Sequence, residues 1–198
     1  MNETWPEIKK RKLKERRGET FDWIQSLVVA LLICVLTFTF FVRVINVSGT
    51  SMLDTLHNED RILVSNLFYK PSQGDIVVLR KESFSTEPIV KRVIAVGGQT
   101  VNMDFEQGIV YVDGVALDEP YTLTPTTRRI DFEDEVLVPE GCLYVMGDNR
   151  NGSTDSRDDR IGCVDERLVI GKALLLIFPG TDRQHGESIE WSRIGVIH

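Results

Sequence analysis

The stretch "PIVKRVIAV" (residues 88–96) is rich in β-branched residues, which is typical of a β-strand. Alternate side chains of a strand share a face, so Lys91 shares one with Ile89 and Val93, while Arg92 lies on the other. A lysine on an otherwise apolar face either costs stability or serves a function. Two interpretations stay open: a buried lysine with a chemical role, or an edge strand whose lysine reaches water.

Similar short runs recur along the chain, separated by Gly, Pro, Asn and Asp. They are "RILVSNLF" (61–68), "GDIVVLR" (74–80), "GIVYVDGVAL" (108–117), "EVLVPEGCLYVMGD" (135–148) and "ALLLIFP" (173–179). Asp113-Gly114 predicts a hairpin with a type I′ turn. The charged segment 119–135 is predicted to be a long surface connection, and the polar residues 180–198 a loosely held tail. The pattern predicts a mostly β domain.

The run "WIQSLVVALLICVLTFTFFV" (23–42) contains no charged residue and is long enough to cross a bilayer as a helix. Residues 1–20 hold seven Lys and Arg against four Glu, which is typical of a cytoplasmic flank. A cleaved signal peptide would be shorter and would end in small residues, whereas this run ends in "FFVRV". We therefore expect a basic cytoplasmic segment (1–20), a transmembrane anchor (21–42) and an external catalytic domain (43–198).

The predicted external domain is acidic, with sixteen Lys and Arg against twenty-five Asp and Glu in residues 43–198. An acidic surface argues against nucleic acid as a partner, because phosphate binding needs basic residues. Cys34 lies in the predicted anchor, and Cys142 and Cys163 lie in the domain. The cysteine spacing fits no metal site, and both a disulfide and two free thiols stay open. We expect no metal and no organic cofactor.

A hydrolase needs a nucleophile, a base and a place for developing negative charge. Histidine is the usual base, but His57, His185 and His198 lie on a predicted turn, in the polar tail and at the last residue, where each is interpreted as solvated. A lysine can replace it if burial or nearby positive charge lowers its pKa from about 10.4. The apolar strand face on which Lys91 lies would provide such burial if it faces the core.

A polar loop, "GDNRNGSTDSRDDRIG" (147–162), follows the predicted strand that ends in "LYVM". Its composition is that of an ordinary surface loop. Alternating Asp and Arg can also lock a loop with ion pairs, which suits a loop that holds catalytic groups still.

Taken together and in order, these segments resemble the bacterial type I signal peptidases (leader peptidases), membrane-anchored serine proteases with a Ser/Lys dyad. Four blocks carry the resemblance: "SGTSMLDTL" (48–56), "GDIVVLR" (74–80), "VKRVIAVGGQTV" (90–101) and "GDNRNGSTDSR" (147–157). The segments "EPY" (119–121) and "GKALLLIFP" (171–179) agree as well. The resemblance covers the anchor and nearly all of the domain. It implies coiled antiparallel sheets behind one N-terminal transmembrane helix.

The resemblance also implies roles for individual residues. Ser51 is the expected nucleophile, with its backbone N–H in the oxyanion hole, and Lys91 is the expected general base. Ser153 is expected to hydrogen-bond the lysine amine and orient it. Val47 and Val90 are expected to line shallow pockets for small side chains at substrate positions P1 and P3.

Two ion pairs are implied in the same way. Arg92 is expected to pair with Asp148, and Asp155 with Arg157. Together these pairs would tie the loop 147–157 to the strand that carries the base.

Two positions depart from the family pattern. Gly49 stands where some members have a serine that donates to the oxyanion, so the second donor is left open among a backbone group, water and Ser48. Asp54 stands where the family usually has proline. Its charge would raise the pKa of Lys91 unless the carboxylate points to solvent.

The implied function is a membrane-bound endopeptidase that removes N-terminal signal peptides after A-x-A-like sites, at the outer face of a bacterial cell membrane. Its partners would be preproteins and the lipid bilayer, without nucleic acid or metal. A self-cleaving Ser/Lys repressor would need a DNA-binding domain, which residues 1–42 do not offer. A catalytically silent, membrane-anchored binding module is the remaining alternative, and it would be expected to have lost Ser51, Lys91 or Ser153.

Overall fold

In the computed structural model of the chain, the described residues are 20–36, 42–180 and 189–197. The chain divides into two compact units, Met1–Phe41 and Val42–His198. We call the second unit the β body.

The first unit contains a helix over residues 20–36. Among the described residues, no helix is both long enough and apolar enough to cross a membrane. The anchor predicted over residues 21–42 includes residues 37–41, and the basic segment predicted over residues 1–20 falls almost entirely on residues 1–19. Both stretches lie outside the described residues.

The β body is built from two antiparallel sheets, as the predicted mostly β domain requires. The large sheet has the order β1-β2-β11-β3-β4-β9-β10, with β12 on β11, and the small sheet has the order β7-β6-β5-β8. The large-sheet strands are β1 (Val42–Asn46), β2 (Arg61–Ser65), β3 (Ile76–Leu79), β4 (Ile89–Val96), β9 (Cys142–Met146), β10 (Val164–Asp165), β11 (Val169–Phe178) and β12 (Gly195–Val196). The small-sheet strands are β5 (Thr100–Asp104), β6 (Ile109–Val112), β7 (Val115–Ala116) and β8 (Glu135–Leu137). Short 3₁₀ helices are η1 (Glu166–Leu168) and η2 (Trp191–Arg193).

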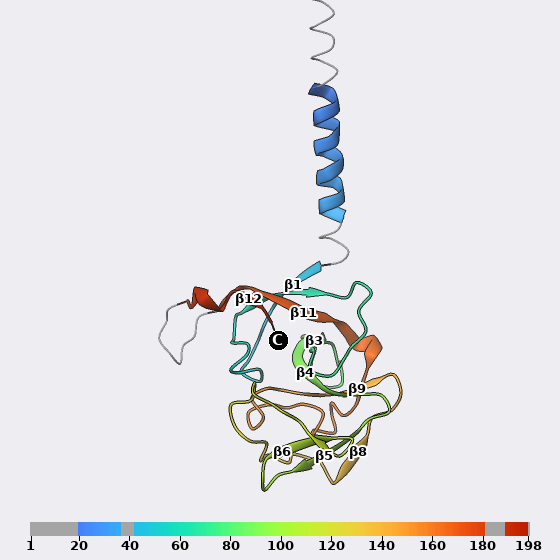
Figure 1. Cartoon of the computed structure of the whole chain (residues 1–198), viewed down its shortest axis with the longest axis vertical. Coiled ribbons are helices and arrows are strands. Elements are labelled where there is room, and N and C mark those ends of the chain that lie inside the picture. The colour runs from blue at the N-terminus through green and yellow to red at the C-terminus, as the bar shows by residue number, and fades with distance from the viewer. Residues whose placement is uncertain (1–19, 37–41, 181–188, 198) are drawn as a thin grey trace, which may run out of the picture. The chain divides into compact units, whose positions relative to one another are not determined.

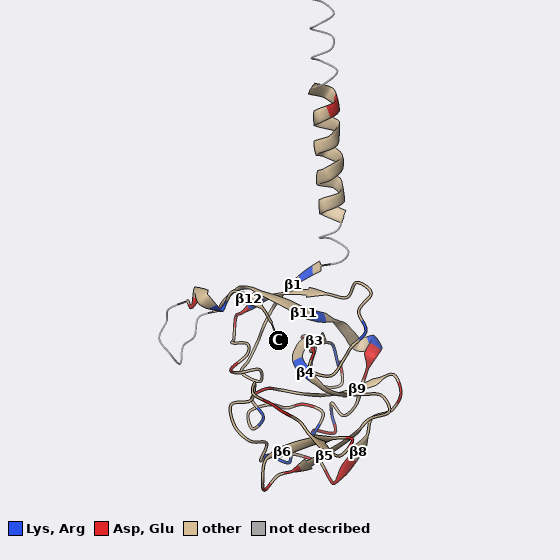
Figure 2. Ribbon diagram, in the orientation of Figure 1, with Lys and Arg blue, Asp and Glu red and all other residues tan. Residues whose placement is uncertain are grey.

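Strands β1, β11 and β12 of the large sheet lie at one end of the β body and the small sheet lies at the other, with β3, β4 and β9 of the large sheet between them (Figure 1). All four residues of β3 are buried, because one apolar cluster takes Val78 and another takes Val77 and Leu79 on the opposite face. A strand covered on both faces has a continuous apolar sequence, as β3 does. Basic segments on β4 and β11 interrupt strands that are otherwise mostly uncharged (Figure 2).

β4 lies inside the large sheet, between β3 and β9. Lys91 pairs with Val77 of β3, and its side chain is only 3% exposed. The interpretation in which Lys91 reaches water from an edge strand is therefore wrong, and the buried lysine is confirmed.

Other predictions have clear outcomes in the β body. The hairpin is confirmed, because Asp113 and Gly114 both have positive φ angles, 52° and 77°, as a type I′ turn requires. The prediction of a loosely held tail is wrong for residues 189–197, because β12 in this segment pairs with β11. Cys142 and Cys163 are free thiols, so the disulfide is not formed.

Candidate active site

Ser51 lies on a closed loop, residues 48–58, between β1 and β2; we call it the nucleophile loop. The Val47 N–H donates to the Asp60 carbonyl over 2.7 Å, and the Gly49 N–H donates to the Asn58 side-chain oxygen over 2.9 Å. Gly49 has φ of 92°, a conformation that favours glycine. The loop is thereby closed at its base.

The nucleophile loop is anchored from below by apolar side chains. Met52 and Leu56 are buried and belong to one cluster with Val47 and Val90. The Leu56 N–H donates to the Met52 carbonyl over 2.8 Å. The two residues predicted to line the substrate pockets therefore lie together in the cluster that supports the loop.

Lys91 and Ser51 are in contact. The lysine Nζ donates to the serine Oγ over 2.7 Å. Burial lowers the pKa of Lys91 from 10.5 to about 8, and the positive charge of Arg157 acts in the same direction. The carboxylates of Asp155 and Asp148 raise it in part. A lysine that is partly neutral near pH 8 and touches a hydroxyl can act as its general base.

The loop after β9 fixes the backbone of the nucleophile loop. The Asn149 N–H donates to the Ser51 carbonyl and its side-chain amide donates to the Thr50 carbonyl, both over 3.1 Å. A Cβ atom at Gly147 would lie 2.3 Å from the Ser51 carbonyl oxygen and 2.4 Å from the Ser153 hydroxyl. Only glycine allows this close approach.

Ser153 is fully buried. Within residues 42–180 and 189–197, its hydroxyl has no hydrogen-bond partner, so the hydrogen bond expected with Lys91 is not formed. A buried hydroxyl without a partner costs stability, which is common at sites that act on another molecule. Its role as a supporting residue stays a prediction.

The predicted pairing of Arg92 with Asp148 is confirmed. Two parallel hydrogen bonds join the guanidinium to the carboxylate, Nε to Oδ1 over 2.8 Å and Nη2 to Oδ2 over 2.7 Å. Both side chains are almost fully buried. The Thr55 hydroxyl donates to Asp148 Oδ2 over 2.5 Å, so the pair connects the nucleophile loop to β4.

The predicted pairing of Asp155 with Arg157 is also confirmed. The bonds are Nε to Oδ1 over 2.8 Å and Nη2 to Oδ2 over 2.9 Å, and both side chains are fully buried. Asp155 also accepts from the Gly147 N–H over 3.1 Å. The pair therefore holds the glycine that contacts Ser51.

Three supporting residues were not predicted individually from the sequence. Arg150 is fully buried and forms a bidentate pair with Glu119. The Tyr121 ring lies under the Arg92 guanidinium, 3.8 Å from ring centroid to Cζ, and its hydroxyl donates to Glu119 over 3.0 Å. Burial and the Glu119 charge raise the pKa of Tyr121. The signal in the sequence was the segment "EPY", which contains two of the three.

Asp54 does not face the dyad. Its side chain is 70% exposed and lies 3.6 Å from His57 Nε2. The charges that act on the pKa of Lys91 are those of Asp155, Asp148 and Arg157. The alternative in which the carboxylate points to solvent is the one that the structure supports.

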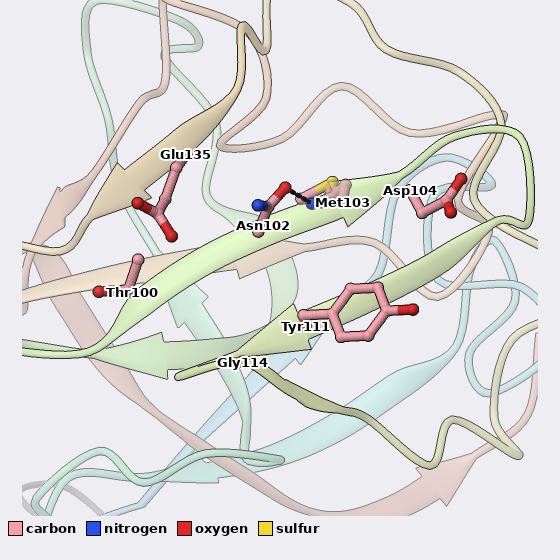
Figure 3. A pocket seen from close by; sticks show the side chains of 7 residues that line it. All are labelled: Thr100, Asn102, Met103, Asp104, Tyr111, Gly114 and Glu135. Carbon is pink, nitrogen blue, oxygen red and sulfur yellow. Dashed lines mark hydrogen bonds between the residues drawn. The ribbon is translucent and has the colours of Figure 1, made fainter.

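A pocket of about 300 Å³ lies on the small sheet, away from Ser51 and Lys91 (Figure 3). Asn102, Asp104, Tyr111 and Glu135 contribute polar groups to it, and it contains none of the predicted site residues. Among the described residues, no three His, Cys, Asp or Glu side chains are grouped so that they could hold a metal ion.

Comparison with known proteins identifies the family to which this chain belongs. Residues 20–178 match the family described as signal peptidase, peptidase S26, and the chain belongs to that family.

Its relatives include named signal peptidases from several bacteria. A probable signal peptidase I-1 of Synechocystis sp. is 36% identical over 182 residues, which cover 87% of this chain and 85% of the relative. Signal peptidase I of Bacillus licheniformis is 32% identical over 85% of this chain and 94% of its own. Signal peptidase I S of Bacillus subtilis is 32% identical over 83% of this chain and 92% of its own.

Proposed function

We propose that this chain removes N-terminal signal peptides from exported proteins, with Ser51 as the nucleophile and Lys91 as the general base. The observation that carries the assignment is the 2.7 Å contact between a hydroxyl and a buried lysine whose pKa is lowered to about 8. Family membership supports the reaction class, a serine peptidase.

The chemistry follows from the positions of the groups. Neutral Lys91 takes the proton of Ser51 as Oγ attacks the scissile carbonyl carbon, and then gives it to the departing amine. Within the described residues no group accepts from the Ser51 N–H, so this donor is available to the oxyanion. A water molecule deprotonated by Lys91 then hydrolyses the acyl-enzyme.

The substrate is proposed to bind as an added strand beside β4. Residues 89–91 pair with β3 on one side, whereas pairing with β9 begins only at Arg92. This leaves an edge of β4 open next to Lys91, where an extended peptide finds backbone partners. Val47 and Val90 would limit P1 and P3 to small side chains, which gives an A-x-A-like specificity.

We further propose that the protein is anchored in a bacterial cell membrane by one span, with its N-terminus cytoplasmic and the β body outside. The uncharged run 23–42 and the basic residues before it support this topology. An anchor would confine the site to the surface from which preproteins emerge, and so raise their effective concentration. The binding-module alternative is not favoured, because Ser51, Lys91 and Ser153 are all present.

The test is cleavage of a preprotein by the full-length protein in detergent. Ser51→Ala and Lys91→Ala are each expected to abolish cleavage, whereas the matched surface changes Ser83→Ala and Lys70→Ala are expected to leave it unchanged. A preprotein with lysine at P1 should not be cut. The assignment is wrong if the wild type cuts no preprotein, or if either dyad variant keeps a near-normal rate.

A further inference from the structure

We propose that Arg193 and Asp60 form a positioning pair that holds the nucleophile loop in register with Lys91, so that residues 189–197 are a working part of the active site. The inference rests on the proposed function. It concerns a segment that the sequence pattern indicated to be a loose tail.

Asp60 is fully buried at the base of the nucleophile loop and joins three segments. Its carboxylate accepts from the His57 N–H over 2.8 Å and from the Gly180 N–H over 2.7 Å. Arg193 donates to it from Nη1 over 3.1 Å and from Nη2 over 2.7 Å. A buried carboxylate needs such partners, so removing the arginine leaves the Asp60 charge buried without its ion-pair partner.

A continuous chain of contacts leads from this pair through the nucleophile loop to Arg92, the neighbour of Lys91. Arg193 Nη2 approaches the Thr55 carbonyl at 3.5 Å, and the Thr55 hydroxyl donates to Asp148 over 2.5 Å. Asp148 in turn pairs with Arg92, the neighbour of Lys91. Arg193 therefore contacts the loop residue whose hydroxyl reaches the Asp148–Arg92 pair.

The arginine itself is held in place by the rest of its segment. The Trp191 ring packs edge-to-face on Phe178 at 5.1 Å between centroids, and Val196 pairs with Leu175. A Cβ atom at Gly180 would lie 2.1 Å from the Asn58 carbonyl oxygen, so the chain just after β11 packs directly against the base of the loop.

The expected effect is on the position of Ser51, not on the basicity of Lys91. Neither Asp60 nor Arg193 is among the groups that shift the pKa of Lys91. Misplacement of a reacting atom by 1 Å can reduce a rate about 100-fold. Loss of the pair should therefore lower kcat and leave the pH at which the base titrates unchanged.

The experiment compares Arg193→Gln, Asp60→Asn and the double variant in the full-length protein, with a preprotein substrate. The matched control is Arg167→Gln, which removes an exposed Arg–Asp pair elsewhere on the β body. Each pair variant is expected to lower kcat at least about tenfold with KM within about twofold of wild type. The double variant should be no worse than the worse single variant, and Arg193→Lys should recover part of kcat because it keeps the charge.

A second readout does not depend on activity. Amide hydrogen exchange of residues 49–56 should be faster in Arg193→Gln, while that of β9 should be unchanged. Unaltered kcat or unaltered exchange in Arg193→Gln would overturn the inference. So would a fall in kcat together with an upward shift of the titration of Lys91, which would indicate general loosening. A wild type that cuts no preprotein refutes the proposed function, while the exchange measurement still decides the role of the pair.

Discussion

Lys91 and Ser51, forty residues apart in the chain, share a 2.7 Å hydrogen bond between a buried amine and a partly exposed hydroxyl. The amine comes from a strand inside the large sheet, and the hydroxyl from a loop outside it. Their separation therefore depends on the contacts that join loop to sheet, above all those of Asp148 and Asn149.

The first prediction concerns the pH dependence of cleavage. Burial lowers the pKa of Lys91 to about 8, so the neutral base is lost as the pH falls through that value. We expect kcat/KM to fall about tenfold per pH unit below pH 8 and to level off above it. A pH–rate profile on a peptide substrate measures this fall of kcat/KM toward low pH, which we call the acid limb. A limb near 10.5, the ordinary value for lysine, would contradict the assignment.

The charges around Lys91 give a second prediction, in which two variants shift the same limb in opposite directions. Asp155 raises the pKa of Lys91 and Arg157 lowers it. Asp155→Asn should therefore move the acid limb to lower pH and Arg157→Gln should move it to higher pH. Both variants break a buried pair, which costs on the order of 3–5 kcal/mol of stability, so the profiles are recorded at low temperature. Shifts in the same direction would contradict the electrostatic account.

A third prediction is that Lys91 destabilises the fold that holds it. Its pKa is lower in the folded chain than in the unfolded chain, so the unfolded chain binds more protons between about pH 8 and 10.5. The free energy of unfolding should therefore rise across that range. Below pH 8 the lysine should destabilise the fold to its full extent. Lys91→Met should raise stability at pH 7 by up to about 3 kcal/mol, with the gain shrinking toward pH 10.5. Thermal unfolding at several pH values tests the sign; a gain that grows with pH would refute it.

Gly147 gives a fourth prediction, based on space. A Cβ atom there would overlap the Ser51 carbonyl oxygen and the Ser153 hydroxyl, so Gly147→Ala should lower kcat about 100-fold or more. The control is Ser83→Ala, a change at an exposed position outside the loops of the site. Equal activity of the two variants would show that the close approach does not matter.

Asp54 gives the last prediction. Its carboxylate is exposed and near His57, so Asp54→Asn should move the acid limb of kcat/KM by less than about 0.3 pH unit. A downward shift of a full unit would show that the charge reaches Lys91.

Local sequence pattern was enough to predict the elements whose structure depends on neighbouring residues in the chain. The strand at 89–96 and the Asp113-Gly114 turn follow from alternation and turn chemistry, whereas alternation left the burial of Lys91 open. β5 was not predicted, because "TVNMD" is short and mixes apolar with polar residues. β1 was not predicted either, because it begins at Val42, the last residue of the apolar run 23–42 that was assigned to the anchor.

The supporting charges of the site were harder to predict from the sequence. Charged residues usually lie at the surface, so the sequence does not indicate that these side chains are buried. Their burial follows from their partners, and the residues concerned are Asp60, Glu119, Arg150 and Arg193. Glu119 and Arg150 are separated by 31 residues, and Asp60 and Arg193 by 133. No local periodicity encodes such a pairing.

These separations also bear on when activity can arise. The contact from Thr55 to Asp148 spans 93 residues of chain, and long-range pairings in β topologies form slowly. During synthesis, Ser51 and Lys91 emerge well before the loop and the arginine that bring them into register. A nascent copy that still lacks residues 147–157 therefore carries both dyad side chains without the contacts that join their loop to their strand.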